Sequence, residues 1–305
     1  MKILICDTIH EDGVRMLKDA GFEVELDTEI SPEMLVQKIG AYDGMVVRSR
    51  TKVTKDVLNA AKNLKAIARA GVGLDNVDRE YAKEKCIEVY NSPEAPSNAV
   101  AELTIGLMLS MARMITKADA GMKQYKWEKN SLTGYEIQGK TLGVIGLGQI
   151  GFLVAKKAKC LGMKVLVYNR AMERKRQLLE EAKAEEATLE RVYSESDYIT
   201  VHLPLNSETK NMINTEQFMK MKNGVYIINT ARGGIIKESA LKAALDSGKV
   251  KAAALDVFEQ EPTQDKDLVG RANVICTPHI GAGSEEAQVG NSTIVAEKLI
   301  KFFKP

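Results

Sequence analysis

Short apolar runs alternate with helix-like stretches along the whole chain. In the first part of the chain these runs predict strands at residues 2–6, 23–26, 44–49, 64–69 and 87–90. The stretches between them have helical spacing, and in one of them Ser31 is the expected N-cap, with Pro32 at the first helical position. Strands that alternate with helices are typical of a parallel sheet.

The same alternation returns after residue 140. Apolar runs there predict strands at residues 141–146, 164–168, 198–203, 224–229, 252–257 and 273–278. They indicate a second parallel sheet that is covered by helices on both faces. The expected fold class is therefore α/β, with two Rossmann-like, doubly wound parallel-sheet domains.

Two further segments have helical patterns. Residues 97–122 form a long, mostly apolar helical stretch, which predicts a buried core helix or a helix at a subunit interface. Residues 284–304 predict one amphipathic helix at the end of the chain.

Composition narrows the class of protein. A chain of 305 residues suggests two domains, and a net charge of +2 argues against a protein built to grip nucleic acid or an anionic membrane. No apolar run of 18 residues and no signal-peptide pattern occur, and the four cysteines form no C-x-x-C pair. We therefore expect a cytoplasmic protein with reduced thiols. Its three histidines do not cluster, so we expect no metal site.

The segment "GLGQIG" at 146–151 lies between a predicted strand and a predicted helix, and another strand follows. In such a βαβ unit Gly146 permits the tight turn, Gly148 lets the backbone approach a pyrophosphate, and Gly151 allows close helix–strand packing. The helix start at Gln149 and Ile150 offers free N–H groups to phosphates. The segment therefore predicts a dinucleotide site.

The end of the next strand raises the question of which dinucleotide is bound. An acid that binds the adenosine ribose is usual there, but this chain has Asn169 followed by Arg170. Loss of the acid removes a charge that would repel a 2′-phosphate, and the Arg170 guanidinium could bind that phosphate. Asn169 can still hydrogen-bond a ribose hydroxyl. We expect NAD or NADP, with a slight lean to NADP.

Parallel sheets bind ligands beyond the carboxyl ends of their strands, so the strand ends are where reactive residues should lie. The segments at those ends are 202–205, 229–234, 255–262 and 277–283, and they bring an Arg, two acids and a His to one rim. His279 suits proton transfer near neutral pH, and Arg232 suits a substrate carboxylate.

These segments resemble the D-2-hydroxyacid dehydrogenase family, and the resemblance covers essentially the whole chain. The sequences that carry it are 48–54, 69–78, 146–151, 229–236, 255–262 and 278–287. The resemblance implies that His279 is the general acid/base, Glu261 its carboxylate partner and Arg232 the substrate-binding electrophile. Asp256 would support the nicotinamide end of the cofactor.

The resemblance also implies ligand-binding residues. The expected substrate-binding residues are Arg48, Ser49, Arg50, Val72, Gly73, Arg232 and His279. The expected cofactor-binding residues are Gly146, Gly148, Gln149, Ile150, Gly151, Asn169, Arg170, His202, Leu203, Pro204, Thr209, Thr230, Ala231, Arg232, Asp256, His279 and Gly281.

The domains implied by the resemblance are discontinuous. A flavodoxin-like substrate domain would comprise residues 1–97 and 284–305, and the NAD(P)-binding domain would be inserted as residues 98–283. Helices near 98–125 would join two copies in a homodimer, and dimers could pair into tetramers. No nucleic-acid or membrane partner is expected.

The substrate is expected to be a D-2-hydroxy acid or its 2-keto acid. The closest likeness is to family members that interconvert D-3-phosphoglycerate and 3-phosphohydroxypyruvate in serine biosynthesis, here in a short form without a C-terminal regulatory domain. Arg48 and Arg50 could bind the phosphate, although one or both could simply face solvent. The alternatives are a glyoxylate/hydroxypyruvate reductase and, in another class, an NAD(P)-sensing, corepressor-like binding protein.

Overall fold

The computed structural model describes residues 1–305 and divides them into two compact units. Unit 1 comprises Met1–Ser97 and Ala282–Pro305, and unit 2 comprises Asn98–Gly281. The domains implied by the family resemblance have the same first boundary, at residues 97 and 98, and a second boundary at residue 284. Both units are α/β, which confirms the predicted fold class.

Unit 1 is built on a five-stranded sheet in which every strand pair is parallel. Its strands are β1 (Lys2–Ile5), β2 (Glu23–Leu26), β3 (Gly44–Val47), β4 (Ala66–Arg69) and β5 (Glu88–Asn91). The order β2-β1-β3-β4-β5 is that of flavodoxin-like sheets. The apolar runs predicted all five strands.

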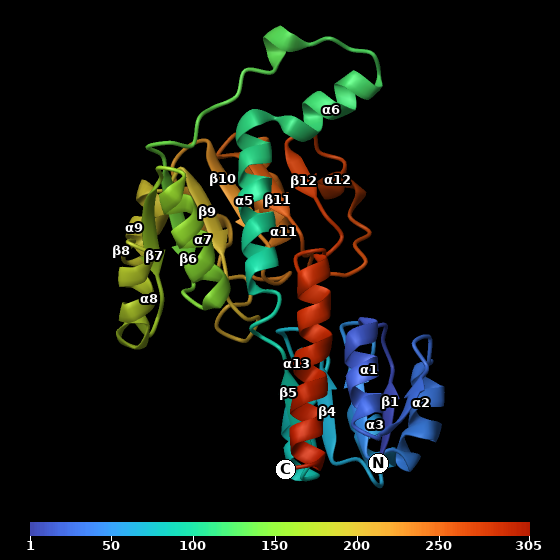
Figure 1. Cartoon of the computed structure of the whole chain (residues 1–305). Helices are drawn as coiled ribbons and strands as arrows, with labels where there is room; N and C mark the ends of the chain where they lie inside the picture. Colours follow the sequence, from blue (N-terminus) through green and yellow to red (C-terminus); the bar gives the residue numbers. More distant parts are fainter. The chain divides into compact units, whose positions relative to one another are not determined.

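Helices cover both faces of this sheet (Figure 1). They are α1 (Glu11–Asp19), α2 (Pro32–Lys38), η1 (Ile39–Ala41), α3 (Lys55–Ala60), α4 (Arg79–Glu84) and α13 (Glu285–Phe303). Alternate residues of β1 point to opposite faces, so Ile3 and Ile5 pack with α1 and α13, whereas Leu4 packs on the other side. As predicted, Ser31 caps α2, because its hydroxyl accepts the Met34 N–H at 3.2 Å.

Unit 2 is built on a seven-stranded parallel sheet. Its strands are β6 (Thr141–Ile145), β7 (Lys164–Tyr168), β8 (Glu185–Glu186), β9 (Tyr198–Val201), β10 (Val225–Asn229), β11 (Val250–Leu255) and β12 (Val274–Cys276). Only the two-residue edge strand β8 was not predicted, because it has no apolar run. The order β12-β11-β10-β9-β6-β7-β8 reverses between β6 and β9, which makes that point the crevice where doubly wound folds bind dinucleotides.

The helices of unit 2 complete its layers. They are α5 (Ser97–Arg113), α6 (Ile115–Lys123), η2 (Lys129–Ser131), α7 (Gln149–Cys160), η3 (Met172–Lys175), α8 (Arg176–Glu181), α9 (Leu189–Glu195), α10 (Thr215–Lys220), α11 (Glu238–Asp246) and α12 (Lys266–Val269). The long helix expected between the two halves is broken. Met114 adopts a left-handed conformation with φ of +52°, and α6 bends away from α5 by 67°.

After this break the chain makes an excursion that we call the arm, residues 115–135. Figure 1 shows α6 and the segment after it standing clear of the other elements of unit 2. The excursion closes where the Tyr135 N–H donates to the Ala112 carbonyl at 2.8 Å. No single helix is long and apolar enough to cross a membrane, and only α5 and α6 together, despite their bend, meet that test by length and composition.

Candidate active site

His279 and Glu261 form a hydrogen-bonded pair at the carboxyl end of the unit 2 sheet. His279 Nδ1 lies 2.8 Å from Glu261 Oε2, and the two side chains are 42% and 38% exposed. His279 Nε2 makes no hydrogen bond within the chain. Because the carboxylate holds Nδ1, Nε2 is the ring atom that remains available to exchange a proton with a ligand.

The pKa of Glu261 is the balance of opposing effects. Partial burial acts to raise it, but the hydrogen bond and charge of His279, the Phe258 N–H and the positive charge of Arg232 outweigh burial and lower it below its usual range. The carboxylate is therefore ionised at neutral pH, where it can accept a hydrogen bond from His279 Nδ1.

Asp256 organises the loop that carries His279. Its side chain is completely buried at the end of β11. Oδ1 accepts the Thr277 hydroxyl at 2.6 Å and the Ile280 N–H at 2.8 Å, and Oδ2 accepts the Gly281 N–H at 2.8 Å. His279 itself has a positive φ of +54°, a conformation that costs energy outside glycine and is held here by these bonds. In this structure the Asp256 carboxylate is thus occupied by the loop.

Arg232 follows β10 in a turn that Asn229 stabilises. The Asn229 amide donates to the Arg232 carbonyl at 2.9 Å and accepts the Ala231 N–H at 3.1 Å. The turn packs closely against the segment that follows β11, and a Cβ at Gly233 would lie 1.7 Å from the Phe258 carbonyl oxygen. Only glycine fits there, which keeps Arg232 near enough to Glu261 to lower the pKa of its carboxyl group.

Of the other two histidines, only His202 belongs to unit 2, and its ring is buried. His202 Nε2 lies 3.0 Å from the Thr200 hydroxyl, and burial lowers the pKa of the imidazole to about 3. His202 is therefore neutral at physiological pH. His10 belongs to unit 1, where its ring contacts Asp12 and Glu285 at the starts of α1 and α13. His279 is accordingly the best candidate for proton transfer in unit 2.

The glycine turn has the shape expected for a pyrophosphate. Gly146 has φ of +102°, and a Cβ there would meet the His202 carbonyl oxygen at 2.4 Å. A Cβ at Gly151 would lie 2.0 Å from the Gly146 carbonyl oxygen, so this position also requires glycine. Gly148 is exposed with no atom near its missing Cβ, and it caps the twelve-residue helix α7. These residues fit a dinucleotide phosphate.

Asn169 and Arg170 both lie beside this turn. The Asn169 side-chain oxygen accepts the Leu147 N–H at 3.1 Å, so Asn169 supports the turn directly. The Arg170 guanidinium forms an exposed ion pair with Glu208, in the loop after β9. A 2′-phosphate bound by Arg170 would therefore compete with the Glu208 carboxylate.

The remaining predicted cofactor residues follow β9 and β10. The Thr209 hydroxyl donates to the Pro204 carbonyl at 2.6 Å, which closes the loop that begins at His202 and Leu203. Thr230 is buried, and its hydroxyl lies 2.8 Å from that of Thr104 in α5. Thr230 is thus tied to the helix that leads into the arm.

Unit 1 holds the other predicted substrate residues. The Arg48 guanidinium makes one bond, to the Thr8 carbonyl at 3.2 Å, whereas that of Arg50 donates to three carbonyls and pairs with Asp7. Val72 and Gly73 lie in a loop in which their own N–H groups make no hydrogen bond. Ser49 is exposed in the loop after β3.

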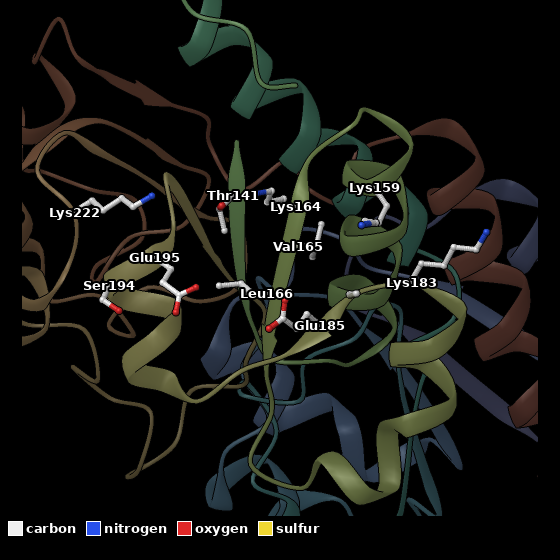
Figure 2. A pocket seen from close by; sticks show the side chains of 11 residues that line it. Thr141, Lys159, Lys164, Val165, Leu166, Lys183, Glu185, Ser194, Glu195 and Lys222 are labelled. Atoms are coloured by element: carbon white, nitrogen blue, oxygen red, sulfur yellow. The ribbon is translucent and has the colours of Figure 1, made fainter. Parts of the chain in front are cut away.

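A cavity of about 760 Å³ lies elsewhere in unit 2 and is lined by several lysines and glutamates (Figure 2). Thr141 and Lys164, which begin β6 and β7, place it at the amino ends of the strands. Two of its acids, Glu185 and Glu195, pair with Arg191. Because parallel sheets bind their ligands at the opposite end, we do not assign the active site to this cavity.

Sequence reasoning missed several supporting residues. Asn229, Thr277 and Thr104 position the predicted residues Arg232, Asp256 and Thr230. Their only signal is a polar side chain at or just after a buried strand, or a threonine on the inner face of an apolar helix. That signal identifies a position and not its partner.

Comparisons with known proteins agree with this geometry. Residues 105–281 match the family model described as D-isomer specific 2-hydroxyacid dehydrogenase, NAD binding domain. The chain is 47% identical to a D-3-phosphoglycerate dehydrogenase of Methanocaldococcus jannaschii, over 100% of this chain but only 58% of that protein. It is 45% identical to a hydroxypyruvate reductase of Thermotoga maritima, over 98% of this chain and 97% of the relative.

A solved structure gives the same result. A glyoxylate reductase from Paecilomyes thermophila superposes with a TM-score of 0.91 at 28% identity, covering 100% of this chain and 95% of that one. The sequence family, the two parallel sheets and the strand-end site therefore agree. The chain belongs to the D-isomer-specific 2-hydroxyacid dehydrogenase family.

Proposed function

We propose that the protein catalyses the reversible oxidation of a D-2-hydroxy acid to the corresponding 2-keto acid with a nicotinamide dinucleotide. The observation that carries this proposal is the His279–Glu261 pair, whose Nε2 atom is unbonded at the sheet rim that also carries the glycine turn. A protein that only sensed the dinucleotide would not need a polarised proton carrier there.

The residues divide the chemistry between them. A bound nicotinamide would supply the hydride acceptor for C2 of the hydroxy acid and, in the reverse direction, the hydride donor for the keto acid. His279 Nε2 takes the hydroxyl proton in the oxidative direction and donates it in the reverse direction. Glu261 stabilises the imidazolium that forms, and Arg232 binds the substrate carboxylate and polarises the adjacent oxygen. The N–H groups of Val72 and Gly73 are the candidate carboxylate donors of unit 1.

The favoured substrate pair is D-3-phosphoglycerate and 3-phosphohydroxypyruvate, which would make the protein an enzyme of serine biosynthesis. The relative from M. jannaschii supports this choice, and Arg48 offers a cation for the phosphate. The second candidate is hydroxypyruvate or glyoxylate reduction. Two observations favour it: the T. maritima relative matches along nearly its whole length, and the guanidinium of Arg50 is already engaged within unit 1.

A substrate panel tests the proposal. We expect the wild-type protein to oxidise NADH or NADPH with 3-phosphohydroxypyruvate, and to do so with higher kcat/KM than with hydroxypyruvate or glyoxylate. His279→Ala should lower kcat by roughly two to four orders of magnitude while the Kd of the cofactor changes little. Near-normal turnover in that variant would remove His279 from the mechanism. Cofactor binding without turnover of any 2-keto acid would instead support a sensing protein.

The cofactor proposal is that NADP is usable and slightly preferred. Support comes from the missing acid at Asn169 and from the guanidinium of Arg170, whose partner Glu208 is solvent-exposed and therefore weakly held. NAD is the alternative, because an Asn169 amide can still reach a ribose hydroxyl.

We also propose that the arm joins two copies of the chain. No residue of α6 is buried, and large apolar side chains lie open along the arm, including Tyr125 at 98% and Trp127 at 77% exposure. Apolar surface of this kind marks an interaction site. No residue of the arm belongs to the hydrophobic clusters that form the core of unit 2.

A further inference from the structure

The loop of residues 48–51 is held from two sides by side chains of unit 1. Asp7 Oδ2 accepts the N–H groups of Arg48 and Thr51 at 2.5 and 3.3 Å, and Asp7 Oδ1 accepts the Thr51 hydroxyl at 2.8 Å. On the other side, the Asn76 amide donates to the carbonyls of Arg48 and Thr51 at 2.7 and 2.6 Å. The backbone on either side of Ser49 and Arg50 is therefore fixed.

Arg50 is part of this support. Its Nε lies 3.1 Å from Asp7 Oδ1, and its guanidinium donates to the carbonyls of Cys6, Thr28 and Ile30 at 2.5, 2.6 and 3.2 Å. Turning this side chain toward a ligand would break all of these bonds and leave Asp7 without its counter-charge. Arg48 would lose only its single bond to Thr8.

Asp7 is only 4% exposed, and a carboxylate buried to that degree requires partners that balance its charge. Here those partners are the N–H groups of Arg48 and Thr51, the Thr51 hydroxyl and the Arg50 guanidinium, so every bond of the Asp7 carboxylate goes to the 48–51 loop.

We propose that Asp7 is a positioning residue, which holds the backbone of residues 48–51. It thereby orients Arg48 and Ser49, which bind the anionic end of the substrate. Arg50 does not bind the substrate but helps Asp7 to hold the loop. The proposal rests on the proposed function, because it assumes that this loop binds substrate. It assigns different roles to two arginines that the sequence presents as equivalent.

Asp7→Asn tests the proposal, because the amide keeps one acceptor oxygen but loses the charge. Asp43→Asn is the matched control: Asp43 also accepts a backbone N–H, from Lys2 at 2.8 Å, but at the amino end of the same sheet. In Asp7→Asn we expect the KM for 3-phosphohydroxypyruvate to rise about tenfold or more, from the loss of charge-assisted bonds. The kcat and the KM of the cofactor should stay within about threefold. Asp43→Asn should change none of the three.

Hydrogen–deuterium exchange of a peptide covering residues 47–53 provides a readout that does not need turnover. Exchange of the Arg48 and Thr51 amides should accelerate in Asp7→Asn and not in Asp43→Asn. An unchanged KM and unchanged exchange in Asp7→Asn would overturn the proposal, and so would equal changes in kcat and in both KM values. A wild-type protein with no activity on 2-keto acids would refute the proposed function, and the exchange comparison would still decide whether Asp7 orders the loop.

Discussion

Arg48 and Arg50 are separated by one residue, yet their surroundings differ completely. Arg50 has four partners within unit 1, whereas Arg48 has one. A guanidinium with one weak contact can reorient toward a phosphate at little cost, and one that holds three carbonyls cannot. The two positions should therefore respond differently to mutation.

We expect Arg48→Ala to reduce kcat/KM for 3-phosphohydroxypyruvate at least about tenfold more than for hydroxypyruvate, because it removes a charge-assisted bond to the phosphate alone. Arg50→Ala should instead lower the free energy of unfolding by about 1–3 kcal/mol and affect both substrates equally. Steady-state kinetics with the two substrates and thermal denaturation of both variants provide the measurements. Equal losses for both substrates in Arg48→Ala would favour the reductase activity.

Among the elements, the β6–α7–β7 unit carries the cofactor argument. Its glycines are required by the backbone contacts at Gly146 and Gly151, and Asn169 at the end of β7 bonds the turn between them. Arg170 is the next residue, and its ion pair with Glu208 joins β7 to the loop after β9. An exposed ion pair contributes little stability, so a phosphate that binds the guanidinium at two points can displace the carboxylate.

Two variants test the cofactor preference in opposite directions. Asn169→Asp combined with Arg170→Pro should shift the ratio of kcat/KM values toward NADH by about tenfold or more, through one lost attraction and one added repulsion. Glu208→Gln should shift the ratio toward NADPH, because it frees Arg170 and removes a negative charge.

The control for the second variant is Glu195→Gln, which breaks a comparable exposed pair with Arg191 at the amino ends of the strands. That substitution should leave the ratio unchanged. A wild-type preference for NADH of more than a hundredfold would contradict the lean to NADP.

The break between α5 and α6 shows what an element's own sequence does not reveal. Residues 97–122 are mostly apolar and contain no proline, so their pattern predicts one continuous helix. The helix ends at Arg113 because Met114 is left-handed and because the Ala112 carbonyl accepts the N–H of Tyr135, a residue far along the chain. A partner at that separation is invisible to a local pattern.

For the molecule as a whole, the arm is the feature that unit 2 does not explain. Its exposed side chains include the only tryptophan of the chain. If the arm joins two copies, Trp127 is buried in the dimer, and dissociation should expose it to water.

We expect the wild-type protein to elute as a dimer in size-exclusion chromatography with light scattering. Dilution should shift the Trp127 emission to longer wavelength as dimers dissociate. Tyr125→Glu combined with Trp127→Glu should give monomers, because two charges would be buried in an apolar interface. Met219→Glu is the control, since Met219 is 71% exposed on α10, outside the arm. A monomeric wild type, or a double variant that remains dimeric, would refute this role of the arm.

The parallel sheets and the glycine turn could be predicted from the sequence because their causes are local. Buried parallel strands need continuous apolar runs, and a tight turn before a helix needs glycine. The strand at Ile3–Ile5 and the turn at Gly146–Gly151 can therefore be predicted from the local sequence alone. Candidate reactive residues at strand ends can also be predicted, because the carboxyl ends of parallel strands lie at one edge of the sheet. His279 and Arg232 were accessible to this reasoning.

Which donor each carboxylate binds is decided by contacts between residues far apart in the sequence. Asp256 holds the His279 loop, Asp7 binds Arg50, and Glu208 pairs with Arg170, across separations of about 20 to 40 residues. A carboxylate's role depends on which donors lie within about 3 Å. That distance is set by the packing of elements against one another and not by the residues adjacent in the sequence. The chain's pattern therefore specifies which groups reach the rim, and folding decides which of them remain available to a ligand.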